Sequence, residues 1–391
     1  MISLKDYITE EEIKPYRFVY LWFDDPDDPD DPESTADDFI SEGKKLELKG
    51  YKVDVSGAYS DLDSKGKRFI YGKDDDKGFL VDENTIVFVR APVTRRKSWM
   101  DLLTQLERGG VCCVNNRHCM ESTSDKFRTS LILAENDLNQ PKTVLIHHQD
   151  RALATFDRMG SKYPIILKTL TGSLGVGVVK IETEEALSAT TQLLYKLDPN
   201  MGVLLQDFVV ATYDVRAHVI AGKFYGAIKR PIVKKDFRSN VALGSIPETI
   251  TLTKLEQDHV VRAAKAVDGL WVGVDFIPAK DREKDSPIFI EINATPGTKG
   301  YKEATKANIA KRISRPPKIS ASGSNIHLVT GPTERNPISS GLAPYCFSNS
   351  ALTNAMARSF CSSGRAAISG DSLICSSKDD IFRAASWATN I

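Results

Sequence analysis

Three oxygen-bearing side chains between residues 271 and 300 have a spacing that suits metal binding. Asp275 lies on an expected strand over 272–278, and Glu291 and Asn293 lie on a second one over 288–294. Because side chains alternate along a strand, Glu291 and Asn293 share a face, which Asp275 joins if the two strands pair. Two carboxylates and an amide oxygen form a hard donor set, which suits Mg²⁺ and the phosphates that it binds. The solvated face of a hairpin explains the same pattern, and this stretch alone leaves both interpretations open.

A lysine and a run of glycines form a second candidate site. Lys168 ends an expected strand, and Gly172, Gly175 and Gly177 follow within nine positions. Glycines let a backbone approach a phosphate, and a lysine neutralises its charge. The string matches neither GxxxxGK[ST] nor GxGxxG, the two commonest phosphate motifs. A hairpin with flexible glycines accounts for it equally well.

Further basic side chains are expected at strand ends or at the start of a helix, rather than on amphipathic faces: Lys126, Arg216, Arg230 and Arg238. Arg238 is followed by Ser239 and Asn240 in an expected loop. Asp214 shares a face with Arg216 by alternation, so it could contact a ribose or pair with a nearby cation. Each of these residues, taken alone, suits a structural role as well as a functional one.

The overall composition argues against several classes of protein. The chain carries 52 basic and 52 acidic side chains, so no basic surplus argues for binding to nucleic acid or membrane. The sequence contains no run of about 18 apolar residues, so no membrane span is expected. The first residues lack the apolar core of a signal peptide. Six cysteines without metal-finger or disulfide-framework spacing favour reduced thiols in a cytoplasmic protein. The six histidines are scattered, which favours structural or surface roles.

The first part of the chain alternates between strands and helices. Strands are expected over 18–23, 51–55, 86–89 and 111–114, and helices over 34–48 and 99–108. This alternation predicts an open α/β sheet of roughly 120 residues. The acidic run 24–32 has proline at every third position, which favours a solvated loop over a functional acidic arm.

The next part of the chain has a different pattern. The stretch 122–136 starts with capping residues and is expected to continue as a helix that carries Lys126. We expect a further helix over 149–159, and strands over 141–146, 165–169 and 203–208. Thr183 is suited to cap a helix that runs to Leu197. A hairpin over 215–220 and 224–229, and a helix over 255–267 with Thr253 as its cap, lead to the two strands that carry the carboxylates. This order predicts an α+β body with a small lid on it.

These patterns divide the chain into four parts. We expect an N-terminal α/β domain over residues 1–121, a lid domain over 122–207, a central domain with the metal site over 208–313, and a tail over 314–391. The 78 residues of the tail hold 16 serines and 11 charged side chains. That composition predicts a poorly ordered, flexible segment with short helices over 351–360 and 379–388.

The order of these features resembles the ATP-grasp superfamily, and most closely its RimK-type α-L-glutamate ligases. The resemblance covers residues 18–313 and is specific from Lys126 onward, where it is carried by DKFRTSLILAENDLNQPKT, ILKTLTGSLGVGVV, LLQDF, YDVRAHVIAGKFYGAIKR, DFRSN, GVDF and FIEINATPG. It implies a mixed α/β fold, with an N-terminal open α/β domain, a small lid domain and a central domain that binds nucleotide and Mg²⁺. The hinge has Asp207 where the family usually has Glu.

The resemblance also implies roles for individual residues. Lys168, Arg216 and Arg230 would act in catalysis, and Asp275, Glu291 and Asn293 would bind magnesium. The loop 171–177 would close over the β- and γ-phosphates, and the backbone of the hinge would contact the adenine edge. The residues implied to bind the nucleotide are Lys126, Lys168, Gly172, Ser173, Gly175, Gly177, Gln206, Asp207, Phe208, Asp214, Arg238, Ser239 and Asn240.

The activity implied by the resemblance is ATP-dependent ligation of a carboxylate to an amine through an acyl phosphate, with release of ADP and phosphate. The implied cofactors are ATP and Mg²⁺, with Mn²⁺ as a substitute. The implied partners are an amino acid, glutamate above others, and a peptide or protein C-terminus as acceptor, and a homo-oligomer would fit the family.

Two alternatives stay open at this point. The first is a ligase that makes a small dipeptide or a glutathione-like metabolite, with a substrate pocket near Arg90, Arg95, Arg96 and residues 299–305. The second is a non-catalytic ATP-binding sensor or scaffold, against which the complete set of metal-binding side chains argues.

Overall fold

The computed structural model describes residues 17–23, 32–45, 48–62, 68–71, 78–82, 84–172, 176–232 and 246–310, and three short strands beyond them. By its contacts the chain divides into two units, Met1–Leu328 and Val329–Ile391. The acidic run 24–31, the loop residues Ser173 and Gly175, and the triplet Arg238, Ser239 and Asn240 lie outside the described residues. The expected domain boundaries within the first unit stay a prediction.

The first unit begins with a parallel sheet whose strand order is β2-β1-β6-β7. Its elements are β1 (Arg17–Trp22), α1 (Pro32–Lys45), β2 (Lys49–Asp54), β6 (Thr85–Val89), α2 (Lys97–Arg108) and β7 (Cys112–Val114). This confirms the expected open α/β sheet. Helix α1 ends earlier than expected because the Leu48 N–H already turns back to donate to the Gly43 carbonyl at 3.0 Å.

A small antiparallel sheet, with the order β3-β4-β5, is a feature that the sequence pattern does not predict. It consists of β3 (Tyr59–Leu62), β4 (Arg68–Tyr71) and β5 (Phe79–Val81). These strands have four, four and three residues, too few for a two-residue alternation to stand out. A 3-10 helix, η2 (Val93–Arg95), follows β6.

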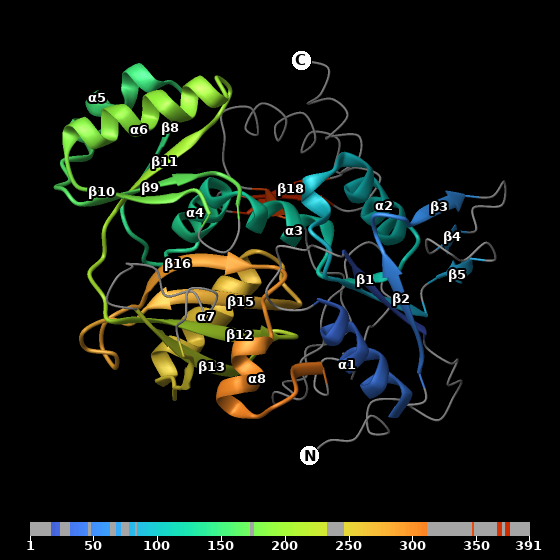
Figure 1. Cartoon of the computed structure of the whole chain (residues 1–391). Helices are drawn as coiled ribbons and strands as arrows, with labels where there is room; N and C mark the ends of the chain where they lie inside the picture. The colour runs from blue at the N-terminus through green and yellow to red at the C-terminus, as the bar shows by residue number, and fades with distance from the viewer. Residues whose placement is uncertain are drawn as a thin grey trace. The chain divides into compact units, whose positions relative to one another are not determined.

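A second sheet, named the lid sheet after the lid that the sequence predicts here, is antiparallel, with the order β10-β9-β11-β8. Its elements are β8 (Thr143–Ile146), the 3-10 helix η3 (Gln149–Arg151), α5 (Ala152–Met159), β9 (Ile165–Thr169), β10 (Val178–Ile181), α6 (Glu184–Leu197) and β11 (Val203–Asp207). Helices α5 and α6 contact each other and lie along this sheet (Figure 1). Thr183 caps α6 as expected, since its hydroxyl accepts from the Ala186 N–H at 3.2 Å.

A third, five-stranded antiparallel sheet has the order β14-β13-β12-β15-β16. Its strands are β12 (Tyr213–Ile220), β13 (Lys223–Pro231), β14 (Glu248–Thr249), β15 (Trp271–Ile277) and β16 (Ile288–Asn293). Helix α7 (Lys254–Ala266) covers one face, where its Val260 belongs to the same buried cluster as Val274 and Phe276. Asp275, between those two residues on β15, therefore faces the other side, which carries the candidate site.

The single helix expected over 122–136 is two helices that meet at Asp125. They are α3 (Arg117–Ser124) and α4 (Lys126–Glu135). The Asp125 carboxylate accepts hydrogen bonds from the backbone N–H groups of Phe127 and Arg128, at 2.8 and 3.0 Å, and so caps α4. Both helices contact β16, and the short helix α8 (Lys299–Thr305) contacts β13.

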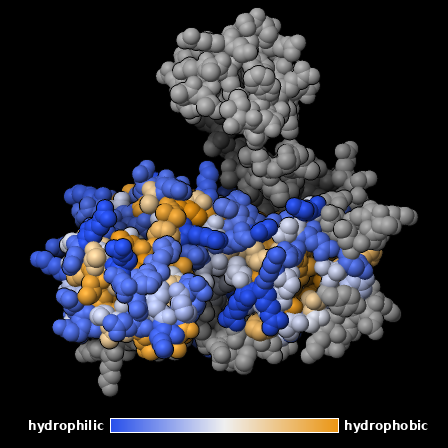
Figure 2. Space-filling view, turned by 90° about the horizontal axis from the view of Figure 1, so that it is seen from above, coloured by the Kyte–Doolittle hydropathy of each residue, from blue (hydrophilic) through white to orange (hydrophobic). Residues whose placement is uncertain are grey.

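The second unit contains the three short strands that the sequence did not predict. They are β17 (Cys346–Phe347), β18 (Ala366–Ser369) and β19 (Ser372–Cys375), in the order β17-β19-β18. The helices expected over 351–360 and 379–388 lie outside the described residues. Nowhere in the described chain is a helix both long and apolar enough to cross a membrane. On the face shown in Figure 2, hydrophobic side chains are interspersed with hydrophilic ones.

A fully buried asparagine joins the first sheet to the five-stranded sheet. Asn115 follows β7, and its Nδ2 donates to the carbonyls of Trp271 and Ala294, at 2.6 and 2.7 Å. Its Oδ1 accepts from the N–H groups of Leu270 and Trp271, at 2.8 and 2.9 Å. The amide thus uses all of its donors and acceptors on the backbone at the start of β15 and just after β16.

Asn115→Ala is expected to lower the free energy of unfolding by about 3–5 kcal/mol, because buried backbone groups lose four hydrogen bonds at once. Urea titration measures the change. The matched control is Asn116→Ala at the next residue, which loses the cap on the Cys119 N–H and an exposed hydrogen bond to Asp268, together worth about 1–2 kcal/mol. Equal losses for the two variants would contradict the role assigned to Asn115.

Candidate active site

The strand register brings the three predicted oxygen donors onto one face. β15 and β16 pair antiparallel, with Asp275 opposite Glu291 and Gly273 opposite Asn293. Because residues two apart on a strand share a face, Asn293 lies beside Glu291 on the face of Asp275. The expectation that the two strands pair is thus confirmed, whereas the assignment of these residues to a metal stays a prediction.

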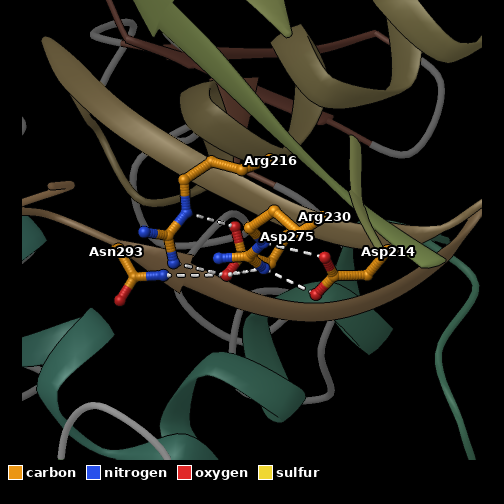
Figure 3. A network of polar contacts seen from close by, with 5 residues as sticks. All are labelled: Asp214, Arg216, Arg230, Asp275 and Asn293. Atoms are coloured by element: carbon orange, nitrogen blue, oxygen red, sulfur yellow. Dashed lines mark hydrogen bonds and ion pairs between the residues drawn. The ribbon is translucent and has the colours of Figure 1, made fainter. Parts of the chain in front are cut away.

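Asp275 is held by two guanidinium groups (Figure 3). Arg216 donates from Nε and Nη2 to the two carboxylate oxygens of Asp275, at 2.8 and 2.6 Å. Arg230 donates from Nη2 to Asp275 at 3.0 Å and binds both oxygens of Asp214, at 2.8 and 2.5 Å. The register explains these pairs, since Arg216 is opposite Asp275 and Asp214 is opposite Arg230. Of the two roles left open for Asp214, the structure shows the pairing with a cation.

This network of four charges is largely removed from water. Asp275 and Arg230 are each 3 % exposed. Burial alone would raise the pKa of Asp275, but the guanidiniums of Arg216 and Arg230 outweigh it and hold that pKa well below its ordinary value. Burial would likewise lower the pKa of Arg230, and the carboxylates of Asp275 and Asp214 more than reverse that effect. Two cations and two anions compensate one another, which is the condition for keeping charges buried.

The donor set fits a magnesium ion on chemical grounds. Asn293 turns its Nδ2 toward Asp275 at 3.5 Å, which directs its carbonyl oxygen away from the ion-pair network (Figure 3). Among the described residues, none donates a hydrogen bond to the Glu291 carboxylate, and Asp275 Oδ1 accepts a single one, from Arg216. Both carboxylates therefore keep lone pairs for a metal. No three His, Cys, Asp or Glu side chains cluster in the part of the chain that the structure describes. An ion held here would therefore need the Asn293 oxygen as well.

Lys168 lies within electrostatic reach of Glu291 and of a second lysine, Lys126. Lys168, on β9, donates from Nζ to Gln206 Oε1, on β11, at 2.6 Å. Removal of its ammonium from water lowers the pKa of Lys168 to about 8, while the Glu291 carboxylate opposes this shift and Lys126 adds to it. Lys126, the first residue of α4, donates from Nζ to the Gly172 carbonyl at 3.0 Å. Lys168 on β9 thus lies between the Glu291 carboxylate of the five-stranded sheet and the Lys126 ammonium of α4.

The described ends of the glycine-rich loop close on each other. The Thr169 N–H donates to the Gly177 carbonyl at 2.9 Å, and Gly177 has a φ of 74°. A Cβ on Gly177 would lie 2.2 Å from Thr169 Oγ1, so glycine alone fits there. Gly172 also lies in the left-handed half of φ space, at 125°. This geometry is compatible with a backbone that approaches a phosphate.

At the expected hinge, the side chains have partners within the protein. Gln206 is buried, and the Asp207 carboxylate accepts from the Ser161 hydroxyl. The Asp207 N–H donates to the Lys142 carbonyl at 3.0 Å, and the Lys180 ammonium lies 5.2 Å from the centre of the Phe208 ring. These contacts agree with a hinge that would meet an adenine through its backbone rather than its side chains.

Some residues around the site escaped the sequence analysis. Thr143, on β8, accepts a hydrogen bond from Gln206 at 2.8 Å. His218 is fully buried on β12, where burial and then Arg216 lower the pKa of His218 to about 3, so that its ring is neutral. These contacts depend on which strands pair, which a single sequence does not reveal. Arg90, named above for an alternative substrate pocket, donates from Nη2 to the Pro296 carbonyl at 2.8 Å.

Comparisons with known proteins show the family to which the chain belongs. Residues 123–316 match the family model of the RimK-like ATP-grasp domain. A probable alpha-L-glutamate ligase of Coxiella burnetii (strain Dugway 5J108-111) is 32 % identical over 214 residues, which make up 54 % of this chain and 69 % of that protein. Another, from Vibrio vulnificus (strain YJ016), is 27 % identical over 272 residues, or 68 % of this chain and 86 % of that protein.

Among solved structures, the ATP-grasp ligase PsnB in complex with a minimal precursor has a TM-score of 0.58 and 18 % identity, and covers 77 % of this chain and 98 % of its own. The same ligase is also known in complex with a precursor peptide and AMPPNP. At this identity the likeness shows the fold, which is that of the ATP-grasp ligases. With the relatives above, the chain belongs to the RimK-like ATP-grasp family. It is an ATP-grasp ligase of the RimK type.

Arg230→Met is expected to lower the free energy of unfolding by about 3–5 kcal/mol, because it leaves Asp214 and Asp275 buried without their shared cation. Urea titration at neutral pH measures the loss. Arg17→Met is the control, since the Arg17–Asp82 pair has side chains 23 % and 28 % exposed and is expected to contribute about 1 kcal/mol or less. A loss for Arg230→Met no larger than the control would contradict the structural role of the network.

Proposed function

We propose that this protein joins a carboxylate to an amine with ATP, adding glutamate to the C-terminus of a peptide or protein and releasing ADP and phosphate. The observation that carries the proposal is the set Asp275, Glu291 and Asn293 on one sheet face, with Lys168 in electrostatic reach. Membership of the RimK-like family supports ATP as a substrate, and the names of the curated relatives support glutamate. The precursor peptide bound by PsnB supports a peptide acceptor.

Asp275, Glu291 and Asn293 would hold Mg²⁺, with Mn²⁺ as a substitute. When bound, the ion offsets the negative charge of the phosphate oxygens. Arg216 and Arg230 keep the pKa of Asp275 low, so this carboxylate is ionised and able to bind a cation throughout the neutral range.

The remaining nucleotide contacts would come from the lid sheet and the loops around it. Lys126 and Lys168 would bind phosphates through fixed positive charge, under the backbone N–H groups of loop 171–177. The backbone of Asp207 and Phe208 would contact the adenine edge. We propose Gln206, Asp214, Arg238, Ser239 and Asn240 as further nucleotide contacts.

The chemistry has two steps. An oxygen of the acceptor carboxylate attacks the γ-phosphorus, the bond to ADP breaks, and an acyl phosphate forms. The amine of the incoming amino acid attacks the acyl carbon, phosphate leaves with the bonding electrons, and an amide remains after the nitrogen loses a proton. No side-chain nucleophile is required, which suits a chain without a Ser-His-Asp or Cys-His arrangement.

The two arginines of the network would take different parts in these steps. The Arg216 side chain is 19 % exposed and that of Arg230 is 4 % exposed, so Arg216 is better placed to meet the transferred phosphoryl group. Arg230 uses Nε and Nη2 for Asp214 and Asp275, which leaves Nη1 to steady the acyl phosphate. Lid closure over both would exclude water and protect the acyl phosphate from hydrolysis.

We also propose a cytoplasmic location. Within the described residues, Cys112, Cys113 and Cys119 are buried free thiols. Burial raises the pKa of Cys112 to about 11, which keeps this thiol protonated and unreactive at neutral pH.

The test is ADP release from MgATP by the purified full chain, with each of the twenty amino acids alone and with a short acidic peptide. ADP formed only with glutamate, or with glutamate plus peptide, would support the proposal and identify the acceptor. ADP formed with glutamate and a second free amino acid would favour the dipeptide alternative. AMP in place of ADP would overturn the acyl-phosphate scheme.

Glu291→Gln is expected to reduce ADP release by at least about a thousandfold while leaving the fold intact, because one of two proposed anionic ligands becomes neutral. The same assay measures it, with circular dichroism as the check on folding. Glu248→Gln is the matched control, since Glu248 lies on β14 of the same sheet and pairs with Lys229 instead. If Glu291→Gln were as active as Glu248→Gln, the assignment of Glu291 as a metal ligand would be wrong.

The dissociation constant of MgATP is expected to rise as the pH rises through about 8. The Lys168 ammonium attracts phosphate, and with a pKa of about 8 it loses its charge above that pH. If MgATP binds only when Lys168 is charged, its dissociation constant rises by at most about tenfold for each pH unit above 8. Fluorescence titration with a labelled ATP analogue measures the profile. Lys168→Arg keeps its charge over this range and should give a flat profile, and an equal slope in both proteins would assign the titration to another group.

A further inference from the structure

A directional chain of hydrogen bonds runs across three strands of the lid sheet and ends on Lys168. Lys168 Nζ donates to Gln206 Oε1 at 2.6 Å. Gln206 Nε2 donates to Thr143 Oγ1 at 2.8 Å, and the Thr143 hydroxyl donates to the Pro141 carbonyl at 2.9 Å. Gln206 lies directly opposite Thr143 in the β11–β8 ladder, and Leu204, two residues away on the same face, lies opposite Lys168.

The single hydrogen of the Thr143 hydroxyl decides how the Gln206 amide is turned. Because that hydrogen is given to the Pro141 carbonyl, Thr143 Oγ1 can only accept from Gln206. The amide must then present Nε2 to Thr143 and Oε1 to Lys168. The opposite orientation would set the amide N–H₂ against the ammonium of Lys168, two donors face to face, in a side chain that is 5 % exposed.

Gln206 in turn restrains where the Lys168 ammonium lies. Glu291 attracts this ammonium and Lys126 repels it, so without the acceptor on β11 it would be drawn toward the Glu291 carboxylate. That carboxylate is one of the proposed metal ligands. An ammonium drawn to it would leave the phosphate site and compete with the metal.

We propose that Thr143 is a positioning residue for nucleotide binding, which fixes the amide of Gln206 so that Gln206 holds Lys168 toward the phosphates of ATP. The proposal rests on the proposed function, in which Lys168 binds ATP. Thr143 touches neither substrate nor metal in it and acts through Gln206 alone. The sequence gives no hint of this role, because Thr143 and Gln206 are 63 residues apart and meet only through strand pairing.

Thr143→Val removes the hydroxyl at nearly constant volume, so the Gln206 amide is no longer fixed toward Lys168. We expect MgATP binding to weaken by about tenfold, the size of the hydrogen bond between Gln206 and the charged Lys168 that is then no longer held in place. The KM for the amino acid is expected to stay within about twofold, since the effect is confined to the nucleotide. Thr143→Ser restores the hydroxyl and should restore ATP binding. The matched control is Thr191→Val on α6 in the same domain, where the lost hydroxyl bonds only to the carbonyls of its own helix, and ATP binding should not change.

A double-mutant cycle tests whether Thr143 acts through Gln206. In a Gln206→Met background the amide is absent, so Thr143→Val should change ATP affinity no further. An equal loss in both backgrounds would overturn the inference, as would wild-type affinity in Thr143→Val or a failure of Thr143→Ser to rescue. Absence of MgATP binding by the wild-type protein would instead overturn the proposed function, and this inference with it. The thermal melting points of Thr143→Val and Thr191→Val are compared as well. Equal values would show that weaker ATP binding by Thr143→Val does not come from a general loss of structure.

Discussion

The buried carboxylate of Asp275 is the constraint on which the rest of the site depends. An ionised group that is 3 % exposed is tolerable only with compensating charge, and two guanidiniums from neighbouring strands supply it. Arg216 and Arg230 can meet Asp275 only if β13, β12 and β15 lie side by side in this order and register. The same register sets Glu291 and Asn293 beside Asp275. The charge balance and the sheet topology therefore require each other.

The charges of Lys126, Lys168 and Glu291, outside this network, would favour an anionic ligand. Asp214, Arg216, Arg230 and Asp275 sum to zero. Lys126, Lys168 and Glu291 add one net positive charge, and Lys168 and Glu291 come from different sheets. A neutral core with a cationic rim suits a ligand such as MgATP, whose own charge is negative. Neither lysine forms an ion pair with Glu291, since each ammonium donates to a neutral oxygen instead.

The parts of the structure that depend on local sequence could be predicted. Thr183 and Thr253 cap their helices as expected, because a cap needs only the residues of the next turn. The pairing of the strands that carry Asp275 and Glu291 was predicted as well, since a hairpin joins neighbours in the chain. Asp125 belongs to the run of capping residues expected at the start of 122–136 and does cap α4, whereas the separate helix α3 before it was not predicted. The three short strands β3, β4 and β5 carry too few residues to show a period.

What the sequence could not supply was the set of partners that come from distant strands. The ion pair of Asp214 depends on whether Arg230 lies across the ladder, and that is a fact of register. The pKa of Lys168 depends in the same way on its burial and on Glu291, which comes from another sheet. A family resemblance can carry the identity of a residue across, but its protonation state and its orientation follow from neighbours that no motif contains. For this protein those neighbours, Arg216 for Asp275 and Gln206 for Lys168, determine which charges are available to a nucleotide.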